Sequence, residues 1–235
     1  NTADKKLEKY LTPLRKSTRC IYGGVVLYDD ITTQKVCKII KNKIDYVFVD
    51  TEKKAFLNKP VEVINIERTV RENIDIEKIF YFKANDLTVE AASNFMELLF
   101  ANDIRNISNK KILIIGAGNI GFKLSLKFIE RGAKIYLFNK NKKNIKKIVT
   151  ILNLIKPKAT MNNVKYIKKI KNDFSNYDVI INASNSSKKI LKNKKVLFNE
   201  NLIFLEIGKN LFAKDTLKKF LENTKTRIFR LDVSN

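Results

Sequence analysis

The sequence predicts an α/β protein in which a small N-terminal α/β domain precedes a doubly wound parallel sheet. Three observations support this fold class. Helical and extended patterns alternate along the whole chain. The short strands expected at 112–115 and 179–182 are almost continuously apolar, as strands buried on both faces are. A glycine-rich turn at 116–121 joins one of these strands to a helix, as in βαβ units.

Length and composition fit a globular protein with one large domain or two small ones. The chain has 235 residues, of which 44% are hydrophobic. Its apolar stretches are far shorter than the roughly 20 residues that span a bilayer, and its first residues lack the pattern of a secretory signal. We therefore expect a cytoplasmic protein with no membrane partner. With no histidine and only Cys20 and Cys37, both interpreted as reduced thiols, we expect no metal site.

The formal net charge of +23 is unevenly distributed. Residues 1–109 carry 18 basic and 16 acidic groups, whereas residues 110–235 carry 29 and 8. Codon bias on a solvated surface is the favoured explanation, because the chain is rich in Lys, Ile and Asn, which AT-rich codons encode. The second explanation is that the positive charge attracts a phosphorylated cofactor or an anionic substrate. Nucleic acid is not expected as a partner, because the aromatic and basic stacking motifs of RNA-binding modules are absent.

The elements of the first half follow from hydrophobic period and turn residues. A helix over 87–100, with Asp86 or Thr88 as its cap, has its apolar residues on one face. Before it we expect, in order, a helix at 7–14, a strand at 21–28, a helix at 31–40, a strand at 46–49, a turn at 58–60 and extended runs at 61–66 and 79–82.

The second half alternates more regularly. We expect strands at 112–115, 134–138, 164–167, 179–182, 202–207 and 227–233, and helices at 120–131, 144–154 and 216–222. The polar stretch 102–109 is the favoured boundary. The predicted domains are thus 1–105, a substrate domain that includes a connecting helix at about 86–103, and 106–235, a dinucleotide-binding domain.

The glycine turn is the most informative motif. It follows an apolar strand, opens a helix and precedes another strand, which is the context that a dinucleotide-binding Rossmann turn requires. The first glycine permits the tight turn, the second lets backbone N–H groups approach a pyrophosphate, and the third allows close helix packing. A related domain that binds S-adenosylmethionine, or no ligand, is the alternative. The assigned cofactor-binding residues are Gly116, Ala117, Gly118, Asn119, Ile120 and Gly121.

The end of the next strand bears on the choice of cofactor. Asn139, Lys140 and Asn141 occupy the place where a site for NAD usually has an acid that binds the ribose hydroxyls. The missing carboxylate removes repulsion toward a 2′-phosphate, and nearby lysines add attraction. NADP is therefore favoured, with NAD left open. The alternative is that these lysines are only the exposed start of a helix.

Two further strand ends should face the same crevice. Asn182, Ala183 and Ser184 end the predicted fourth strand of the Rossmann unit, where small side chains leave room for the ribose and nicotinamide. Gly208 ends the strand after it and is also assigned to the cofactor. The alternative for 182–184 is an ordinary buried strand that runs into a polar loop.

Together these motifs resemble the shikimate dehydrogenase-like superfamily. The matching features are the glycine turn, the Asn-Lys-Asn end of the second strand, where the family has Asn-Arg-Thr, and Asn-Ala-Ser at 182–184, where it has Asn-Ala-Thr. The resemblance implies an α/β substrate domain, a connecting helix and an NADP-binding Rossmann domain, with the active site in a cleft between the domains. Asn85-Asp86 is similar to the family's Asn-Thr-Asp, whose acid pairs with a catalytic lysine.

Two family features have no counterpart in this chain. The Ser-x-Ser substrate loop and the Asn-x-Thr-x-Pro-x-Lys catalytic segment are missing. A glutamyl-tRNA reductase would share the Rossmann motifs, but Thr18-Arg19-Cys20 does not supply that family's Ser-x-Cys-Asn-Arg nucleophile segment. The sequence therefore does not predict shikimate dehydrogenase activity itself.

The available proton donors limit the chemistry. Hydride transfer to a carbonyl needs an acid near its oxygen, and the chain has no histidine. Tyr136 and Lys140 have the Tyr-x-x-x-Lys spacing of short-chain dehydrogenases, but they lie in a strand, so we interpret this as coincidence. Lys83 and Asp86, at the start of the connecting helix, are the candidate catalytic residues. The alternative makes Lys83 an ordinary surface lysine and Asp86 a helix cap.

Two functions remain after this reasoning. The favoured one is an NADP-dependent oxidoreductase that transfers a hydride to or from a small polar, anionic carbonyl or hydroxy substrate. The other is a non-catalytic NAD(P)-binding subunit with a regulatory or redox-sensing role. The phosphate turn favours the first, and the missing substrate motifs favour the second. The expected partner is a small-molecule substrate, and a homodimer is left open.

Overall fold

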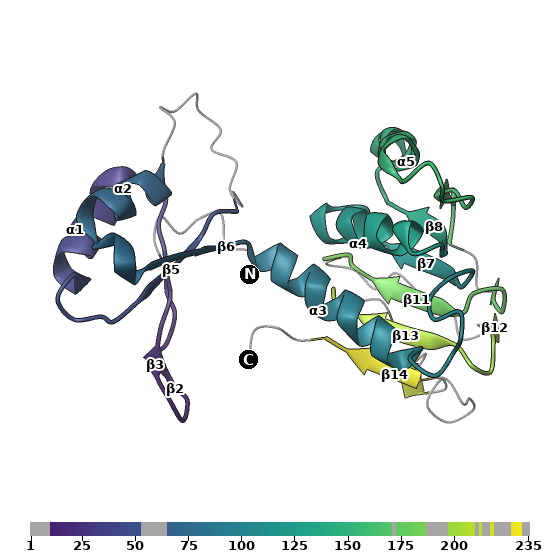
Figure 1. Ribbon diagram of the computed structural model, residues 1–235, viewed down its shortest axis with the longest axis horizontal. Coiled ribbons are helices and arrows are strands. Elements are labelled where there is room, and N and C mark those ends of the chain that lie inside the picture. Colours follow the sequence, from purple (N-terminus) through teal and green to yellow (C-terminus); the bar gives the residue numbers. More distant parts are fainter. Residues whose placement is uncertain are drawn as a thin grey trace. The chain divides into compact units, whose positions relative to one another are not determined.

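The computed structural model divides into two compact units, 1–84 and 85–235, which are described separately (Figure 1). Within them it describes residues 10–52, 65–170, 173–186, 197–209, 212, 217–218 and 227–231. The expected turn at 58–60 lies outside these residues, as do most of the extended run at 61–66 and most of the helix at 216–222.

In its described residues, the first unit contains two α-helices, a 3-10 turn, a parallel two-stranded sheet and two short antiparallel strand pairs. Its helices are α1 (Asp30–Ile40), α2 (Ile66–Asn73) and the 3-10 turn η1 (Ile76–Lys78). Its strands are β1 (Tyr10–Leu11), β2 (Arg15–Lys16), β3 (Ile21–Tyr22), β4 (Val25–Val26), β5 (Val47–Asp50) and β6 (Ile79–Phe82). β5 and β6 pair in parallel, while β1 with β4 and β2 with β3 form antiparallel pairs.

A small apolar core holds this unit together. It contains the buried side chains Cys37, Val49, Val70, Ile74 and Ile79. Burial also raises the pKa of the Cys37 thiol, because a thiolate is poorly solvated there. The core contains residues from α1, β5, α2 and β6, so it joins the helices to the parallel sheet.

Three local expectations for this unit differ from the structure. Tyr10–Leu11 is a strand rather than part of a helix, because it pairs with β4. The single strand expected at 21–28 is two short strands, β3 and β4, interrupted by Gly23 and Gly24. Helix α2 was not expected. It begins where the Asn65 side chain accepts a hydrogen bond from the Arg68 N–H at 3.0 Å.

The second unit is a six-stranded parallel sheet with helices. The strands are β7 (Lys111–Ile115), β8 (Lys134–Phe138), β9 (Lys165–Tyr166), β11 (Val179–Asn182), β13 (Ile203–Glu206) and β14 (Arg227–Arg230). A separate parallel pair consists of β10 (Asp173–Phe174) and β12 (Leu197–Phe198), neither of which was expected. The helices are α3 (Ala84–Leu99), α4 (Asn119–Glu130) and α5 (Lys142–Ile155).

The strand order confirms the doubly wound parallel sheet. It runs β14-β13-β11-β7-β8-β9, and Figure 1 shows β14, β13, β11, β7 and β8 side by side in this order. Counted along the chain, this is the order 3-2-1-4-5-6 of a Rossmann sheet. From β7 the chain adds β8 and β9 toward one edge of the sheet. It then returns to the other side of β7 with β11 and adds β13 and β14 toward the opposite edge. The topological switch point therefore lies between β7 and β11, where sheets of this kind bind ligands.

Alternate residues of each central strand enter different cores. Ile112 and Ile114 of β7 pack into one cluster, and Leu113 and Ile115 into the other. The buried apolar residues of α3, α4 and α5, such as Ala92, Phe128 and Leu152, join the first cluster, and the second contains other apolar residues, such as Phe174 and Phe204. Both faces of β7 are therefore covered, which explains its uninterrupted apolar sequence.

Helix α3 packs with the Rossmann sheet. Its residues Val89, Ala92 and Met96 lie in the same core as β7, and the two compact units divide between Ala84 and Asn85. The predicted boundary, between residues 105 and 106, instead lies after this helix. Since α3 begins at Ala84, Asp86 lies within its first turn and neither Asp86 nor Thr88 is its N-cap.

Ion pairs connect α3 to α4 and to the residue that ends α4. Lys123 pairs with Asp86, Lys127 with Glu90 at 2.8 Å, and Arg131 with Glu97. Each successive partner lies farther along both helices, so the two helices run in the same direction. Beyond α3, Lys110 donates a hydrogen bond to Asp103 that holds the pKa of this carboxyl below its usual range. Among the described residues, no helix is long and apolar enough to cross a membrane.

Candidate functional site

The glycine turn joins the end of β7 to the start of α4. Gly116 has φ +106°, a backbone conformation that favours glycine, and its N–H donates to the Phe138 carbonyl at 2.8 Å. Gly118 is the N-cap of α4, in an extended conformation with φ −76° and ψ −165°. The turn therefore reverses direction at Gly116 and presents the start of a helix at the end of the sheet.

Two glycines of the turn are required by close packing. A Cβ atom on Gly116 would lie 2.8 Å from the Ser184 backbone N and 2.9 Å from the Ala183 carbonyl. A Cβ atom on Gly121 would lie 1.8 Å from the Gly116 carbonyl oxygen. Larger residues at either position would force the turn, the start of α4 or the end of β11 to move.

The middle glycine is different, because it faces open space. A Cβ atom on Gly118 would meet nothing within 4 Å, and both Gly118 and Asn119 are exposed. Gly118 makes no side-chain cap hydrogen bond, whereas Asp29, Asn65 and Asn141 cap α1, α2 and α5. Of the turn's other assigned residues, Ala117 is buried and Ile120 is half-buried. The start of α4 thus has both room and backbone donors for an anion.

The end of β8 lies next to this turn, since Gly116 bonds to Phe138. Asn139 is half-buried and Lys140 is exposed. The Asn141 side chain accepts hydrogen bonds from the backbone N–H groups of Lys143 at 3.1 Å and Asn144 at 3.3 Å. Asn141 is therefore the N-cap of α5, a structural role beside the predicted one in cofactor binding.

The end of β11 meets β7 on its other side. The Ala183 N–H donates to the Ile115 carbonyl at 2.8 Å. Asn182 is fully buried, and its side-chain oxygen accepts from the Ser184 N–H at 3.1 Å and from the Ser184 hydroxyl at 2.7 Å. Its Nδ2 has no hydrogen-bond partner among the described residues. Asn182 therefore shapes the loop after β11 and leaves one buried donor unused.

Gly208 fixes the contact between β11 and β13. Its N–H donates to the Asn182 carbonyl at 2.7 Å, and a Cβ atom there would lie 2.0 Å from the Ser184 carbonyl oxygen. Close backbone packing accounts for a glycine at this position. The contacts of Gly116 and Gly208 with Ser184 bring the carboxyl ends of β7, β11 and β13 together at the switch point.

The two catalytic candidates lie in different compact units. Lys83 is exposed in the first unit, and Asp86 is half-buried in the second. Asp86 is paired with Lys123 of α4, which was not among the predicted site residues. The usable signal was the spacing of Lys123, Lys127 and Arg131, which places cations on one side of α4.

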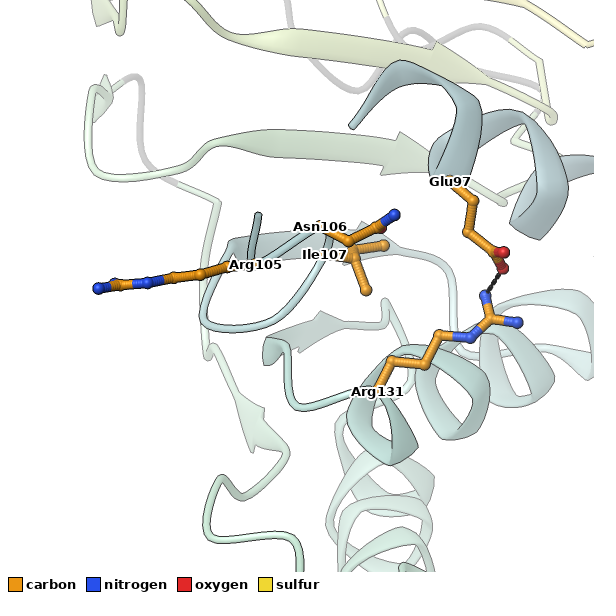
Figure 2. Close-up of a pocket in the computed structure, with 5 residues that line it drawn as sticks. All are labelled: Glu97, Arg105, Asn106, Ile107 and Arg131. Carbon is orange, nitrogen blue, oxygen red and sulfur yellow. Dashed lines mark ion pairs between the residues drawn. The ribbon is translucent and has the colours of Figure 1, made fainter. Parts of the chain in front are cut away.

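A cavity in the second unit lies away from the assigned residues. It measures about 150 Å³ and is lined by Glu97, Arg105, Asn106, Ile107 and Arg131. Figure 2 shows Glu97 and Arg131 paired across it, while the Arg105 side chain points away from them. Asn106 and Ile107 precede β7, so this cavity lies at the opposite end of that strand from the glycine turn. Among the described residues, no group of acidic or cysteine side chains could hold a metal ion.

Comparison with known proteins supports a dehydrogenase-like second half. Residues 98–208 match the family model of shikimate/quinate 5-dehydrogenase. These matched residues include the glycine turn and the ends of β8 and β11. A glutamyl-tRNA reductase of Thermosipho melanesiensis is 32% identical over 115 residues, or 49% of this chain and 29% of the relative. One of Sulfurisphaera tokodaii is 28% identical over 189 residues, or 78% of this chain and 40% of the relative.

The chain thus spans less than half the length of these curated relatives. Among solved structures, a shikimate dehydrogenase in complex with NADP+ is 18% identical and covers 67% of this chain and 53% of its own, with a TM-score of 0.44. Shikimate 5-dehydrogenase of Listeria monocytogenes in complex with shikimate and NAD is 18% identical, with a TM-score of 0.43. The match covers 67% of this chain and 55% of that one. The family match confirms the resemblance to the shikimate dehydrogenase-like, Rossmann-type proteins.

Proposed function

We propose that the protein is an NADP-dependent oxidoreductase whose second unit binds the dinucleotide at the glycine turn. Its substrate would be a small, polar, anionic carbonyl or hydroxy compound. The observation that carries the proposal is the open space at Gly118, beside a helix start without a side-chain cap, at the switch point of a Rossmann sheet. Backbone N–H groups of α4 and its dipole would bind the pyrophosphate.

The remaining assigned residues fit such a ligand. The backbone of Ala183 and Ser184 lies against the turn, and the small side chains of these residues would leave room for the ribose and nicotinamide. When bound, the nicotinamide ring supplies or accepts the hydride. The chain itself must orient the substrate and place a proton donor at its oxygen.

NADP is proposed over NAD because of the charge at the end of β8. No carboxylate follows this strand, while Lys140, Lys142 and Lys143 are all exposed at the start of α5. A 2′-phosphate near these residues would gain cationic partners and the favourable dipole of the helix start. A ribose without this phosphate would gain no carboxylate partner for its hydroxyls.

Replacing Asn139 with aspartate should shift the preference toward NADH. The new carboxylate would repel a 2′-phosphate and accept hydrogen bonds from ribose hydroxyls. We expect the affinity for NADPH to fall by about tenfold or more, the effect of one charge-assisted interaction. Fluorescence titration with both dinucleotides measures this ratio. Asn163→Asp, an exposed site with the same charge change, is the control, and equal shifts in both variants would contradict a specific role for Asn139.

The proposed proton donor is part of the Asp86–Lys123 pair or is Lys83. In the pair, Lys123 carries the proton and Asp86 fixes its position. Its location in the first turn of α3 and the second turn of α4 places it on the glycine-turn side of the α3–α4 row of ion pairs. Lys83 has no corresponding contact among the described residues, so it is the weaker candidate.

A panel of small carbonyl substrates with NADPH tests this assignment. For any carbonyl compound of the panel that the wild type reduces, we expect Lys123→Met and Asp86→Asn to lower kcat by at least about 100-fold, as loss of an acid–base group does. Lys127→Met breaks the next ion pair of the same row and should leave kcat near the wild-type value. Unchanged kcat in Lys123→Met, Asp86→Asn and Lys83→Ala would overturn the catalytic assignment. NADPH binding without turnover of any substrate would favour a non-catalytic regulatory or redox-sensing subunit.

The curated relatives support a second candidate, reduction of an acyl group carried on tRNA. Both are glutamyl-tRNA reductases, and Cys20 offers an exposed free thiol in the turn between β2 and β3. Its Sγ lies 3.2 Å from the Ser17 hydroxyl, which also accepts the Cys20 N–H. Incubation with glutamyl-tRNA, followed by mass spectrometry of Cys20, separates the candidates. A glutamyl adduct that is absent from Cys20→Ser would favour this second activity, and no adduct would exclude it.

A further inference from the structure

We propose that the α5 edge of the second unit binds the surface of an anionic lipid membrane. The first observation is its charge. Residues 131–170 contain 12 lysines and arginines and no aspartate or glutamate. This segment forms β8, α5 and β9, and β9 is an edge strand of the six-stranded sheet. The excess of cations is therefore gathered at one edge of the sheet.

The outward side of α5 combines these cations with large aliphatic side chains. Ile145, Val149 and Leu152 bury the inner side of the helix in the core. On the opposite side, a row at helical spacing contains exposed Lys143 and Lys147, followed by Ile151 and Leu154. Ile151 is 46% exposed and Leu154 is 77% exposed.

Two more large apolar side chains are exposed in the residues that follow this row. Ile155, at the last position of α5, is 51% exposed, and Met161, in the segment before β9, is 96% exposed. Exposed apolar side chains that cluster beside a concentrated charge usually mark a binding surface. Single exposed aliphatic residues would need no such explanation. Here four of them follow the lysines along one helix and the segment after it.

The aliphatic residues favour a lipid surface over nucleic acid. Lysines would attract either polyanion. Nucleic acid, however, gains specificity and affinity from stacking on exposed aromatic rings, and every aromatic residue between 131 and 170 is at least half-buried. Ile and Leu side chains instead enter the interface between headgroups and acyl chains. The lack of a membrane-crossing helix among the described residues does not bear on such peripheral contact.

Sedimentation of the full chain with vesicles tests this proposal. We expect binding to vesicles of phosphatidylcholine with phosphatidylglycerol, and none to phosphatidylcholine alone. Lys143→Glu/Lys147→Glu should weaken binding by about 30-fold or more, since each lysine near an anionic surface contributes about 1 kcal/mol. The control is Lys35→Glu/Lys38→Glu, the same charge change at exposed positions of α1, and it should bind as the wild type does.

A second variant separates insertion from charge attraction alone. Ile151→Ser/Leu154→Ser keeps every lysine and changes only exposed residues, so its thermal unfolding should match the wild type. We expect it to lose vesicle binding at high salt, where charge attraction is screened. The proposal is overturned if the wild type fails to bind anionic vesicles, or if Lys143→Glu/Lys147→Glu and Lys35→Glu/Lys38→Glu bind them equally well. It is also overturned if vesicle binding by Ile151→Ser/Leu154→Ser depends on salt as that of the wild type does. Displacement of the protein from vesicles by single-stranded RNA at equal phosphate concentration would likewise overturn it.

Discussion

Replacing Gly118 with alanine should strongly weaken dinucleotide binding and leave the fold intact. The new methyl group meets no atom within 4 Å, and the backbone at φ −76° accepts alanine without strain. It would, however, occupy the space through which a pyrophosphate approaches the N–H groups of α4. Loss of one or two charge-assisted hydrogen bonds should raise the Kd for NADPH by about 10- to 100-fold or more.

The measurement pairs fluorescence titration with thermal unfolding. We expect the Tm of Gly118→Ala to stay within about 2 °C of the wild type, as for a surface change that removes no contact. The control is Gly24→Ala, at a half-buried glycine of the first unit, where an added Cβ atom would lie at an ordinary 3.4 Å from the Thr12 side chain, and this variant should bind NADPH normally. Normal binding by Gly118→Ala would show that the open space is not a phosphate site.

Replacing Gly121 with alanine, unlike the change at Gly118, should greatly lower the stability of the fold. Its Cβ would lie 1.8 Å from the Gly116 carbonyl oxygen, so the first turn of α4 and the glycine turn cannot both keep their positions. Overpacking of this kind costs about 1–3 kcal/mol or more. Dinucleotide binding should be lost as well, because the turn itself must move.

Urea unfolding of the two variants tests this difference. Gly121→Ala should have a lower midpoint with an unchanged slope, since the unfolded chain exposes the same surface. Gly118→Ala, with the same added methyl three residues earlier, is the matched control and should keep the wild-type midpoint. Equal midpoints for wild type and both variants would contradict the close contact between Gly121 and Gly116.

The parts predicted correctly from the sequence depend on local patterns. The strand, glycine turn and helix at 111–130 could be recognised because each glycine satisfies a short-range backbone requirement. The parallel sheet followed from strands that are apolar on both faces, as Ile112 to Ile115 are. Family resemblance then linked the ends of β8 and β11 to the same site.

The parts that were missed depend on tertiary contacts. The Asp86–Lys123 pair forms because α3 packs beside α4, and residues 37 positions apart give no local signal of this contact. The short strands β1 and β4 are stabilised by pairing with each other rather than by their own sequence. Helix α2 is mostly polar and depends on Val70 reaching the core of the first unit. The backbone contact of Gly208 with Ser184 is likewise a tertiary contact, and the assignment of Gly208 to the cofactor stays a prediction.

The most direct test of the central claim is titration of NADPH and NADH into the wild-type protein and Gly118→Ala, followed by dinucleotide fluorescence. We expect the wild type to saturate with NADPH well below about 1 mM, the upper end of ordinary enzyme–substrate affinities. It should bind NADH more weakly, and Gly118→Ala should bind each dinucleotide about 10- to 100-fold more weakly than the wild type does. If neither dinucleotide binds the wild type below about 1 mM, or if Gly118→Ala binds as well as the wild type, the glycine turn is not a dinucleotide site.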